Sequence, residues 1–510
     1  MRLQTSSMKR ACHVVATIVA VQVLSACVSM RSGLEVEGIS SVASWRSDQL
    51  AGLESELYEV RLPWIHERPG CTEADVTPAN RNTRVTMSVL QIRPEARAGS
   101  QSRDVIVYIP GGPGAAGIAH PLTDPSLFSR ISRTHDVLVV DPRAAGGSEP
   151  YLGAGFEHTV PAEQLSRHIV DMLSQRADEG HVLAAVNTCE AASDIVATID
   201  ALGYRRLRIY GISYGTRIAM HIASEHSHRV ASLVLDGPVL PGAAILEESP
   251  TSAAAALDTF FESVEADTSH NGAFSELREE YFDFRDQLGE GLEFPISFTA
   301  FPGVDAFELT PSSLDAFVFH ALYSSSAIPY LPRTLTEIFR GNFYYRRALE
   351  IVQQQIAEST SNFIVSHYLW WWNDSYRQVD LGRMRELGRG VRQRYPGFFE
   401  QSRRFAGIMH AITDSGAISG RPGVPAADIP ARVPTLILSG ELDPITRLDD
   451  ARRLQESLPH ARLSVLPQGG HGVAWLYASI RDGVISYLED PQTDIEAVFE
   501  RFSAPGYLRL

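Results

Sequence analysis

The feature that most constrains this chain is a series of short strand-like apolar runs, separated by stretches in which apolar residues recur at helical spacing. This alternation is typical of a domain in which helices connect the strands of a mostly parallel sheet. Between two of the runs, helical spacing extends from Ala192 to Leu202, and Gly203 follows as a stop signal. The runs are RVTMSVLQI, DVIVYI, DVLVV, LRIY, ASLVLDG, PTLILSG and RLSVLP. We therefore expect an α/β fold, with a mostly parallel sheet flanked by helices.

The series of strand-like runs is interrupted between Pro241 and Arg432. This stretch contains helix-like segments and aromatic clusters but no convincing series of strands. We expect an inserted, largely helical cap domain here, with GAISGRPGVPAADIPARVP as the linker back to the sheet. The predicted sheet domain then consists of residues 28–240 and 433–510, and the cap consists of residues 241–432.

The first 27 residues are typical of an export signal. Basic residues precede a mostly apolar run that ends in LSAC, and this run is too short and too interrupted to span a bilayer comfortably. LSAC resembles the lipobox of bacterial lipoproteins, which implies that Cys27 is lipidated and becomes the new N-terminus after cleavage. An ordinary secretory signal with an incidental cysteine is the alternative.

The lipobox resemblance implies an exported protein of the bacterial cell envelope, held at the membrane through its N-terminal lipids. Two or three acyl chains hold a protein stably where a single chain does not. Val28, rather than an aspartate, follows the cysteine. By resemblance, this favours the periplasmic face of the outer membrane.

Charge excludes some partners of the folded domain. The formal net charge is −16 at pH 7, and removal of the basic leader makes it more negative. Such a surface repels nucleic acid and anionic lipid headgroups, so we expect neither to bind it. The sequence does not indicate an oligomeric state.

Two cysteines, Cys71 and Cys189, remain once the leader is removed and Cys27 is lipidated. An even number of thiols in an oxidising compartment favours a disulfide between them, against the alternative of two buried free thiols. Neither cysteine has a histidine beside it in the sequence. We therefore do not expect a catalytic cysteine.

The candidate nucleophile is Ser213, in the sequence LRIYGISYGTRIA. A G-x-S-x-G pattern gains meaning where a strand is followed by a helix, because the tight turn then exposes the serine at the end of the sheet. Gly211 and Gly215 flank Ser213, a strand-like run precedes them, and apolar residues at helical spacing follow. The alternative is an ordinary serine in a glycine-rich connection.

A serine at neutral pH needs a base to take its proton and a carboxylate to orient that base. The last two strand-like runs lead into polar loops that contain Asp443 and His471. We expect both side chains at the edge of the sheet where Ser213 lies. Asp236 and Asp141, which each end an earlier strand, compete for the acid role; Asp443 is preferred because its strand directly precedes the histidine loop.

An acyl-transfer enzyme also needs donors for the oxyanion of its tetrahedral intermediate. The backbone N–H of Tyr214 is one expected donor. The second is expected from the loop of VIVYIPGGPGAAG, where glycines such as Gly112 let the backbone approach a substrate. Asp141, with Arg143 in DPRAAGGS, is expected to hold loops together beneath the site.

The motifs PGGPG, DPRAAGGS, GISYGT, GELDPIT and GGHG stand in the order found in the prolyl iminopeptidase and tripeptidyl aminopeptidase branch of the α/β-hydrolases. The chain resembles this family, roughly over residues 83–238 and 433–488. The resemblance implies the α/β-hydrolase fold and a serine aminopeptidase. The residues it implies are Ser213, Asp443 and His471 as catalytic triad, with Gly112 and Tyr214 as oxyanion donors. Pro110 and Thr216 depart from prolyl iminopeptidases, which argues against strict proline specificity.

That family releases residues from free peptide N-termini through an acyl-enzyme, with cap carboxylates that hold the substrate ammonium. The resemblance implies peptide substrates and no metal or other cofactor. The candidate amine ligands are Glu247, Glu248 and Asp374. A carboxylesterase with the same triad and an inactive, lipid-anchored binding protein are the alternatives; a dehalogenase or epoxide hydrolase is disfavoured, because these have an aspartate where Ser213 stands.

Overall fold

The computed structural model of this chain describes most of the region that follows the predicted leader. The predicted signal segment and Cys27 lie outside the described residues. Among the described residues, no helix combines the length and the apolar character that a membrane span requires. The described residues are 39–46, 54–66, 71–73, 84–94, 104–152, 162–242, 245–269, 272–289, 291–295, 306–342, 364–376, 379–419, 421–422, 428–475, 477–502 and 506–507.

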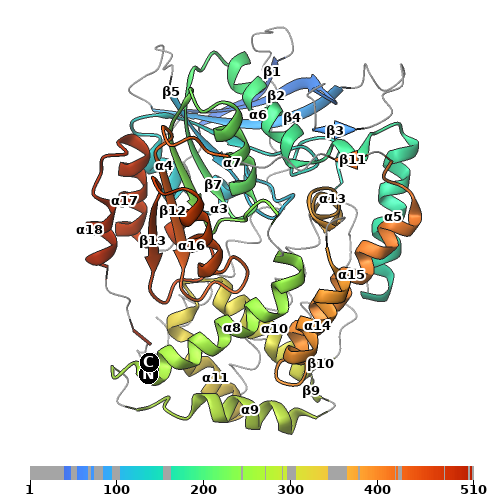
Figure 1. Cartoon of the computed structure of the whole chain (residues 1–510), viewed down its shortest axis with the longest axis vertical. Coiled ribbons are helices and arrows are strands. Elements are labelled where there is room, and N and C mark those ends of the chain that lie inside the picture. Colours follow the sequence, from blue (N-terminus) through green and yellow to red (C-terminus); the bar gives the residue numbers. More distant parts are fainter. Residues whose placement is uncertain are drawn as a thin grey trace.

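A nine-stranded sheet forms the centre of the described structure (Figure 1). It is antiparallel on one side, from β1 to β6, and parallel on the other, from β6 through β5 to β13. In spatial order the strands are β1 (Ile39–Arg46), β2 (Glu54–Pro63), β4 (Arg84–Arg93), β6 (Asp136–Val140), β5 (Asp104–Ile109), β7 (Arg206–Ile212), β8 (Val230–Asp236), β12 (Thr435–Gly440) and β13 (Arg462–Leu466). This arrangement confirms the predicted α/β fold.

Every run that the sequence analysis assigned to a strand forms one, from β4 to β13. The strands β1 and β2 were not expected. In β2, ESELYEVRLP, charged residues interrupt the apolar alternation, and most of the side chains between its buried Ser55 and Val60 are half-buried. A half-buried strand at the antiparallel side of a sheet carries a weaker apolar signal than a central one.

Helices cover both faces of the sheet. Alternate side chains of β5 point to opposite faces, as the strand period requires. Val105 and Val107 pack in the cluster that contains residues of α6 (Thr188–Ala201) and α7 (Gly215–Glu225). Ile106 packs in the cluster that contains residues of α4 (Pro125–Ile131) and α17 (Ala478–Glu489). The central strands are therefore buried on both sides.

The chain between β8 and β12 forms the inserted, largely helical cap, as expected (Figure 1). Its described helices are α8 (Ile245–Ala266), α9 (Leu277–Leu288), α10 (Pro311–Tyr323), α11 (Leu331–Phe339), α13 (Ile364–Asp374), α14 (Leu381–Arg392) and α15 (Pro396–Ser415). Two short strand pairs were not expected: β9 (Leu292–Pro295) with β10 (Ala306–Leu309), and β11 (Arg421–Pro422) with β3 (Thr72–Glu73).

One cap helix belongs to the core of the sheet domain as much as to the cap. Val365, Leu369 and Trp370 of α13 are buried in the same apolar cluster as α6, α7 and one face of the sheet. The cap is therefore joined to the sheet domain by shared packing as well as by its two connections.

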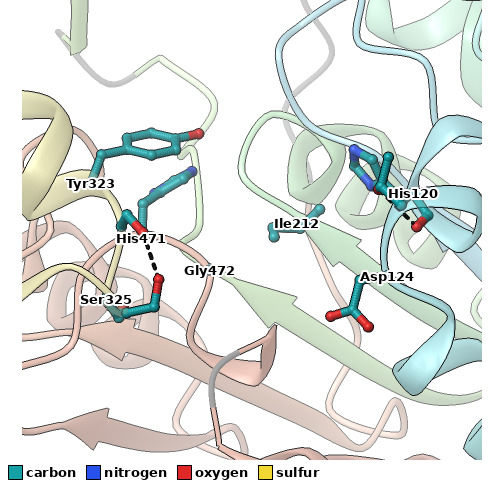
Figure 2. Close-up of a pocket in the computed structure, with 10 residues that line it drawn as sticks. His120, Asp124, Ile212, Tyr323, Ser325, His471 and Gly472 are labelled. Carbon is teal, nitrogen blue, oxygen red and sulfur yellow. Dashed lines mark hydrogen bonds between the residues drawn. The ribbon is translucent and has the colours of Figure 1, made fainter. Parts of the chain in front are cut away.

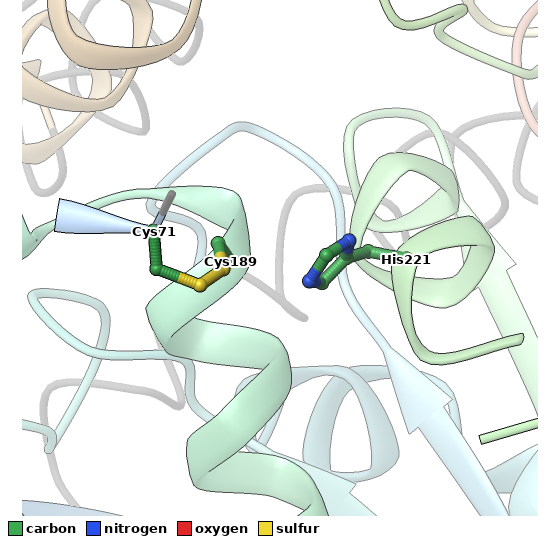
Figure 3. Close-up of side chains that lie close together, drawn as sticks. All are labelled: Cys71, Cys189 and His221. Carbon is green, nitrogen blue, oxygen red and sulfur yellow. A yellow bond between two sulfur atoms is a disulfide. The ribbon is translucent and has the colours of Figure 1, made fainter. Parts of the chain in front are cut away.

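The predicted disulfide between Cys71 and Cys189 is present, with the two Cα atoms 5.4 Å apart (Figure 3). It joins the segment before β4 to the first turn of α6. His221 of α7 lies beside the bonded sulfurs, within 4.8 Å. Because a disulfide has no thiolate to offer, this cluster is not a metal site while the bond is intact.

We predict that the double variant Cys71→Ser, Cys189→Ser is less stable than the parent chain. The disulfide closes a loop with a sequence separation of 118 residues. In the chain-entropy model, a loop of this length contributes about 4 to 5 kcal/mol. Urea unfolding, followed by tryptophan fluorescence, measures the difference. Reduction of the parent chain is expected to lower the midpoint similarly, and equal midpoints of parent and variant would contradict this role of the bond.

Candidate active site

The turn between β7 and α7 holds Ser213 in an unusual backbone conformation. Ser213 has a φ of 54°, in the left-handed region that non-glycine residues rarely adopt. Tyr214 follows as the N-cap residue of α7. A Cβ atom on Gly215 would lie 2.3 Å from the carbonyl oxygen of Ile109, so a glycine is needed for the helix to start this close to β5. The strand, turn and helix context that we expected for G-x-S-x-G is therefore present.

Hydrogen bonds on both sides of Ser213 hold this conformation. Its N–H donates to the carbonyl oxygen of Asp236 over 2.7 Å. Its carbonyl oxygen accepts from the N–H of Thr216 at 2.9 Å and from the hydroxyl of Thr216 at 2.5 Å. A strained residue persists only where its surroundings fix it in this way.

Asp443 and His471 meet as predicted. Asp443 follows β12, His471 follows β13, and His471 Nδ1 lies 2.7 Å from Asp443 Oδ2. The other contacts of Asp443 fix the carboxylate: Oδ1 accepts from the N–H groups of Ile445 and Thr446, each at 2.9 Å, and Oδ2 accepts from the hydroxyl of Thr446 at 2.6 Å. Both side chains are buried.

Burial and charge have opposite effects on this pair. Burial disfavours the ionised carboxylate of Asp443, but the charge and hydrogen bond of His471 outweigh it and lower the pKa of Asp443. Burial likewise opposes the charged imidazole of His471, yet the carboxylates of Asp443 and Asp236 raise its pKa. With Nδ1 bound to Asp443, Nε2 is the ring atom that remains to accept a proton. Nε2 is buried and has no hydrogen-bond partner within the described residues.

The described residues contain no hydrogen bond between Ser213 and His471, so the third link of the triad stays a prediction. The two loops nevertheless share a partner, Asp236. Its carbonyl oxygen accepts from Ser213, and its carboxylate accepts from the N–H groups of Val473 at 2.9 Å and Ala474 at 3.2 Å. In structures without a substrate, catalytic hydrogen bonds are often long and shorten only in the complex.

Asp236 was the competing candidate for the acid role, and its contacts differ from those of a triad acid. Its carboxylate also accepts from the hydroxyl of Tyr210 at 2.8 Å. Burial raises its pKa, although these hydrogen bonds oppose the shift. Asp236 thus orders the backbone of the histidine loop, whereas Asp443 contacts the imidazole ring itself.

The glycine-rich loop after β5 lies against the serine. A Cβ atom on Gly111 would lie 2.7 Å from the Cβ atom of Ser213 and 3.2 Å from its Oγ. Gly112, the predicted oxyanion donor, follows with a φ of 111°, and Tyr214 lies on the other side of Ser213 at the start of α7. Both predicted donor segments therefore border the serine, although their donor role stays a prediction.

Asp141 joins loops beneath this edge of the sheet, as we expected. Its Oδ1 accepts from the N–H of Ile118 and its Oδ2 from that of Gly147, each at 2.9 Å. Burial raises the pKa of Asp141 to about 6, and the hydrogen bonds limit the rise. The neighbouring Arg143 is fully buried and donates to both oxygens of Asp194, at 2.7 and 2.8 Å.

The three carboxylates that we expected to bind a substrate amine each have partners within the protein, which favours a structural role for them. Glu247 accepts from the N–H of Asp380 at 2.5 Å. Glu248 forms ion pairs with Arg383 at 2.9 Å and Arg447 at 3.5 Å. Asp374 is buried and accepts hydrogen bonds from Thr188 and Tyr214.

None of these three acids lines the cavity that His471 borders. This cavity has a volume of about 420 Å³. In Figure 2, Tyr323, Ser325 and His471 lie on one side of it, and His120 and Asp124 lie on the other. The lining residues are His120, Thr123, Asp124, Ile212, Tyr323, Ser324, Ser325, Ser326, His471 and Gly472.

Among the lining residues that were not predicted from the sequence, Tyr323 and Asp124 bear most directly on the chemistry of the site. Tyr323 ends α10, its ring centroid lies 4.6 Å from that of His471, and its carbonyl oxygen accepts from the N–H of His471 at 2.9 Å. Asp124 is the N-cap residue of α4. The Asp-Pro dipeptide at 124–125 is a recognisable helix start, but nothing local indicates that it borders a cavity.

The sequence matches two family models. One is described as the alpha/beta hydrolase fold and matches residues 104–281; the other is described as TAP-like protein and matches residues 417–498. Together they contain Ser213, Asp443 and His471.

Three curated proteins with which the chain shares similarity are named as hydrolases or peptidases. Serine protease Hip1 of Mycobacterium tuberculosis is 31% identical over 172 residues, which cover 30% of this chain and 33% of that protein. Tripeptidyl aminopeptidase of Streptomyces lividans is 26% identical over 159 residues, covering 28% and 30%. Putative hydrolase YuaR of Escherichia coli is 27% identical over 147 residues, covering 28% and 29%. The chain thus matches a third or less of the length of each.

We predict that Asp443→Asn lowers the pKa of His471. The substitution removes the negative charge that favours the imidazolium ion, so the ring loses its proton at a higher proton concentration than in the parent chain. NMR titration of labelled histidines, with the His471 signal assigned by its loss in His471→Gln, measures the pKa. Asp449→Asn, at an exposed site, is the matched control and should leave the pKa unchanged. An unchanged or higher pKa in Asp443→Asn would contradict the assigned pairing.

Proposed function

We propose that this chain, which belongs to the α/β-hydrolase fold family, is a serine peptidase that releases residues from free peptide N-termini. The observation that carries the proposal is the backbone of Ser213, at a φ of 54° between β7 and α7, at the same edge of the sheet as the buried Asp443 and His471 pair. The similarity to a serine protease and to a tripeptidyl aminopeptidase supports a peptide substrate.

The proposed reaction proceeds through an acyl-enzyme. His471 Nε2 takes the proton of the Ser213 hydroxyl as Oγ bonds to the carbonyl carbon of the scissile peptide bond. The carbon–nitrogen bond then breaks, and the imidazolium gives its proton to the departing amine. Water repeats the sequence, with its proton passed to His471 and then to Ser213 Oγ as the ester bond breaks and the acid product leaves.

The pKa of His471 sets the pH dependence of this reaction. His471 accepts a proton only when its ring is neutral, and the carboxylates of Asp443 and Asp236 raise its pKa. Turnover is therefore expected to fall as the pH decreases through this raised pKa. Above it, the neutral form predominates and turnover reaches a plateau.

Asp124 is our revised candidate for the carboxylate that binds the substrate amine. Among the residues that line the cavity beside His471, it is the single acidic one, and none is arginine or lysine. Its Oδ1 accepts from the N–H of Ser126 at 2.9 Å and also from the Ser126 hydroxyl. Within the described part of the chain, Oδ2 has no such partner, so it is available to an ammonium group.

We predict that Asp124→Asn raises the KM of peptides with a free N-terminus about tenfold or more, since a hydrogen bond to a charged group contributes roughly 1.5–3 kcal/mol. Asparagine is as good an N-cap residue as aspartate, so α4 keeps its cap. Steady-state kinetics on tripeptide anilides measure the change. Glu248→Gln, which removes a carboxylate held in ion pairs, is the matched control and should leave KM unchanged.

The same substrates with a blocked N-terminus test the exopeptidase claim in the parent chain. We expect turnover of the free tripeptide anilide and little turnover of its acetylated counterpart. Equal turnover of both would contradict release from free N-termini. Turnover of short nitrophenyl esters without any turnover of the anilides would instead identify a carboxylesterase with the same triad.

We also propose that the protein is exported and held in the bacterial cell envelope by lipids on Cys27. The sequence LSAC after an apolar run supports this, and a disulfide in the folded domain is consistent with an oxidising compartment. Cys27→Ser is expected to abolish incorporation of an alkyne-tagged fatty acid and to release the protein from the membrane fraction. Equal labelling of the variant would contradict lipidation at this residue.

A further inference from the structure

The cap helix α13 contacts the side chain of Tyr214, the residue that follows the candidate nucleophile. The Tyr214 hydroxyl donates to Asp374 at the end of α13. Its ring meets those of Trp370 and Trp371 edge to face, with centroid distances of 5.6 and 5.1 Å. The tyrosine is 1% exposed. One element of the cap thus contacts both the hydroxyl and the ring of Tyr214.

Asp374 is fully engaged by the protein itself. Thr188 donates to it twice, from its hydroxyl at 2.6 Å and from its N–H at 3.1 Å. Burial raises the pKa of Asp374, and the charge of Arg217 together with the hydrogen bonds opposes the shift. The Arg217 guanidinium also lies 5.5 Å from the Tyr214 ring centroid. This network leaves Asp374 to order Tyr214 rather than to bind a ligand.

The first turn of the same helix contacts the glycine-rich loop on the other side of the serine. A Cβ atom on Gly114 would lie 2.5 Å from Ser366 Oγ and 2.8 Å from Ser366 Cβ, so only a glycine lets this loop pack against α13. The carbonyl oxygen of Pro113 accepts a hydrogen bond from His367. Burial lowers the pKa of His367 to about 4, so this contact is made by a neutral ring at pH 7.

We propose that α13 is the positioning element of the oxyanion hole, with Asp374 as the positioning residue that acts through Tyr214. The helix contacts Tyr214 at one end and the Gly112 loop at the other, and these segments supply the two expected donors. The inference rests on the proposed acyl-transfer function, because only a reaction with a tetrahedral intermediate uses such donors. It assigns to the cap a role in the chemical step.

Asp374 can affect the oxyanion hole because the direction of the Tyr214 N–H depends on a strained part of the backbone. The Tyr214 N–H belongs to the peptide that follows Ser213, whose φ of 54° is not a conformation that the backbone adopts unaided. A fixed Tyr214 side chain restricts rotation of that peptide. Loss of a whole oxyanion donor lowers kcat about a hundredfold to a thousandfold. Misalignment of one donor is therefore expected to lower kcat by a smaller factor.

The test is a double-mutant cycle with Tyr214→Phe and Asp374→Asn. We expect each variant to lower kcat about tenfold or more with little change in KM. The kcat of the double variant should be no lower than that of the less active single variant. Affinity for a peptide boronic acid, which forms a tetrahedral adduct with the serine, should fall in parallel. Affinity for the amine product, the peptide that leaves with a new N-terminus, should not change, because it has no anionic oxygen to bind these donors.

The matched control is Trp372→Phe, on the same helix. Trp372 is buried, and its indole N–H donates to the hydroxyl of Thr413 of α15. This variant should keep its kcat and its boronate affinity, whatever it loses in melting temperature. A purely structural role of Asp374 would instead lower stability with no separate loss of boronate affinity.

Three outcomes overturn the inference. Additive effects in the cycle, unchanged kcat in both single variants, or equal losses of boronate and product affinity would each show that α13 does not act through the oxyanion hole. Tyr214→Phe removes a single atom and serves as the informative variant if Asp374→Asn fails to fold. Failure of the proposed acyl-transfer chemistry appears differently: the parent chain would then turn over neither the anilides nor the esters, and the inference would fall with it.

Discussion

The backbone of Ser213 is the constraint on which the rest of this site depends. A left-handed conformation for a residue with a side chain costs free energy, and it must be maintained by contacts that would be lost if the turn relaxed. Asp236 holds the N–H of Ser213, Thr216 holds its carbonyl oxygen, and Gly215 lets α7 begin against β5. The hydroxyl is therefore presented at the end of β7, where the loops that follow β5, β12 and β13 also converge.

Buried carboxylates at this edge of the sheet raise the pKa of His471. Desolvation alone would make His471 a weaker base than a free imidazole. The nearby buried carboxylates of Asp443 and Asp236 reverse this effect and raise its pKa. Asp443 is held by three donors besides the ring, so its charge stays in place when the imidazole is protonated. The charge of Asp236 also favours protonation of His471, and its carboxylate holds the backbone of the loop that contains His471.

The sequence alone predicted those parts of the fold that have a recognisable local pattern of residues. The central strands are buried on both faces and read as continuous apolar runs, and the turn at Ser213 has a recognisable local pattern. The pairing of Asp443 with His471 followed from the position of each at the end of a parallel strand. The strands β1 and β2 escaped notice because polar and charged residues interrupt the apolar alternation in their sequences.

The residues around the cavity could not be predicted for a different reason. Asp124 and Tyr323 reach it from α4 and α10, which are distant in sequence, and only the tertiary arrangement brings them beside His471. Glu247, Glu248 and Asp374 were plausible amine ligands as carboxylates in a cap. Their actual contacts, with Asp380, Arg383 and Tyr214, depend on helix packing that has no local sequence signal.

The proposed reaction requires that His471 activates Ser213 at one edge of the sheet. The most direct measurement is the site of reaction with a fluorophosphonate, identified by mass spectrometry of the digested protein. We predict a single phosphonylated residue, Ser213, and loss of that labelling in both Ser213→Ala and His471→Gln. Undiminished labelling in His471→Gln, or an adduct on a different serine, would contradict it.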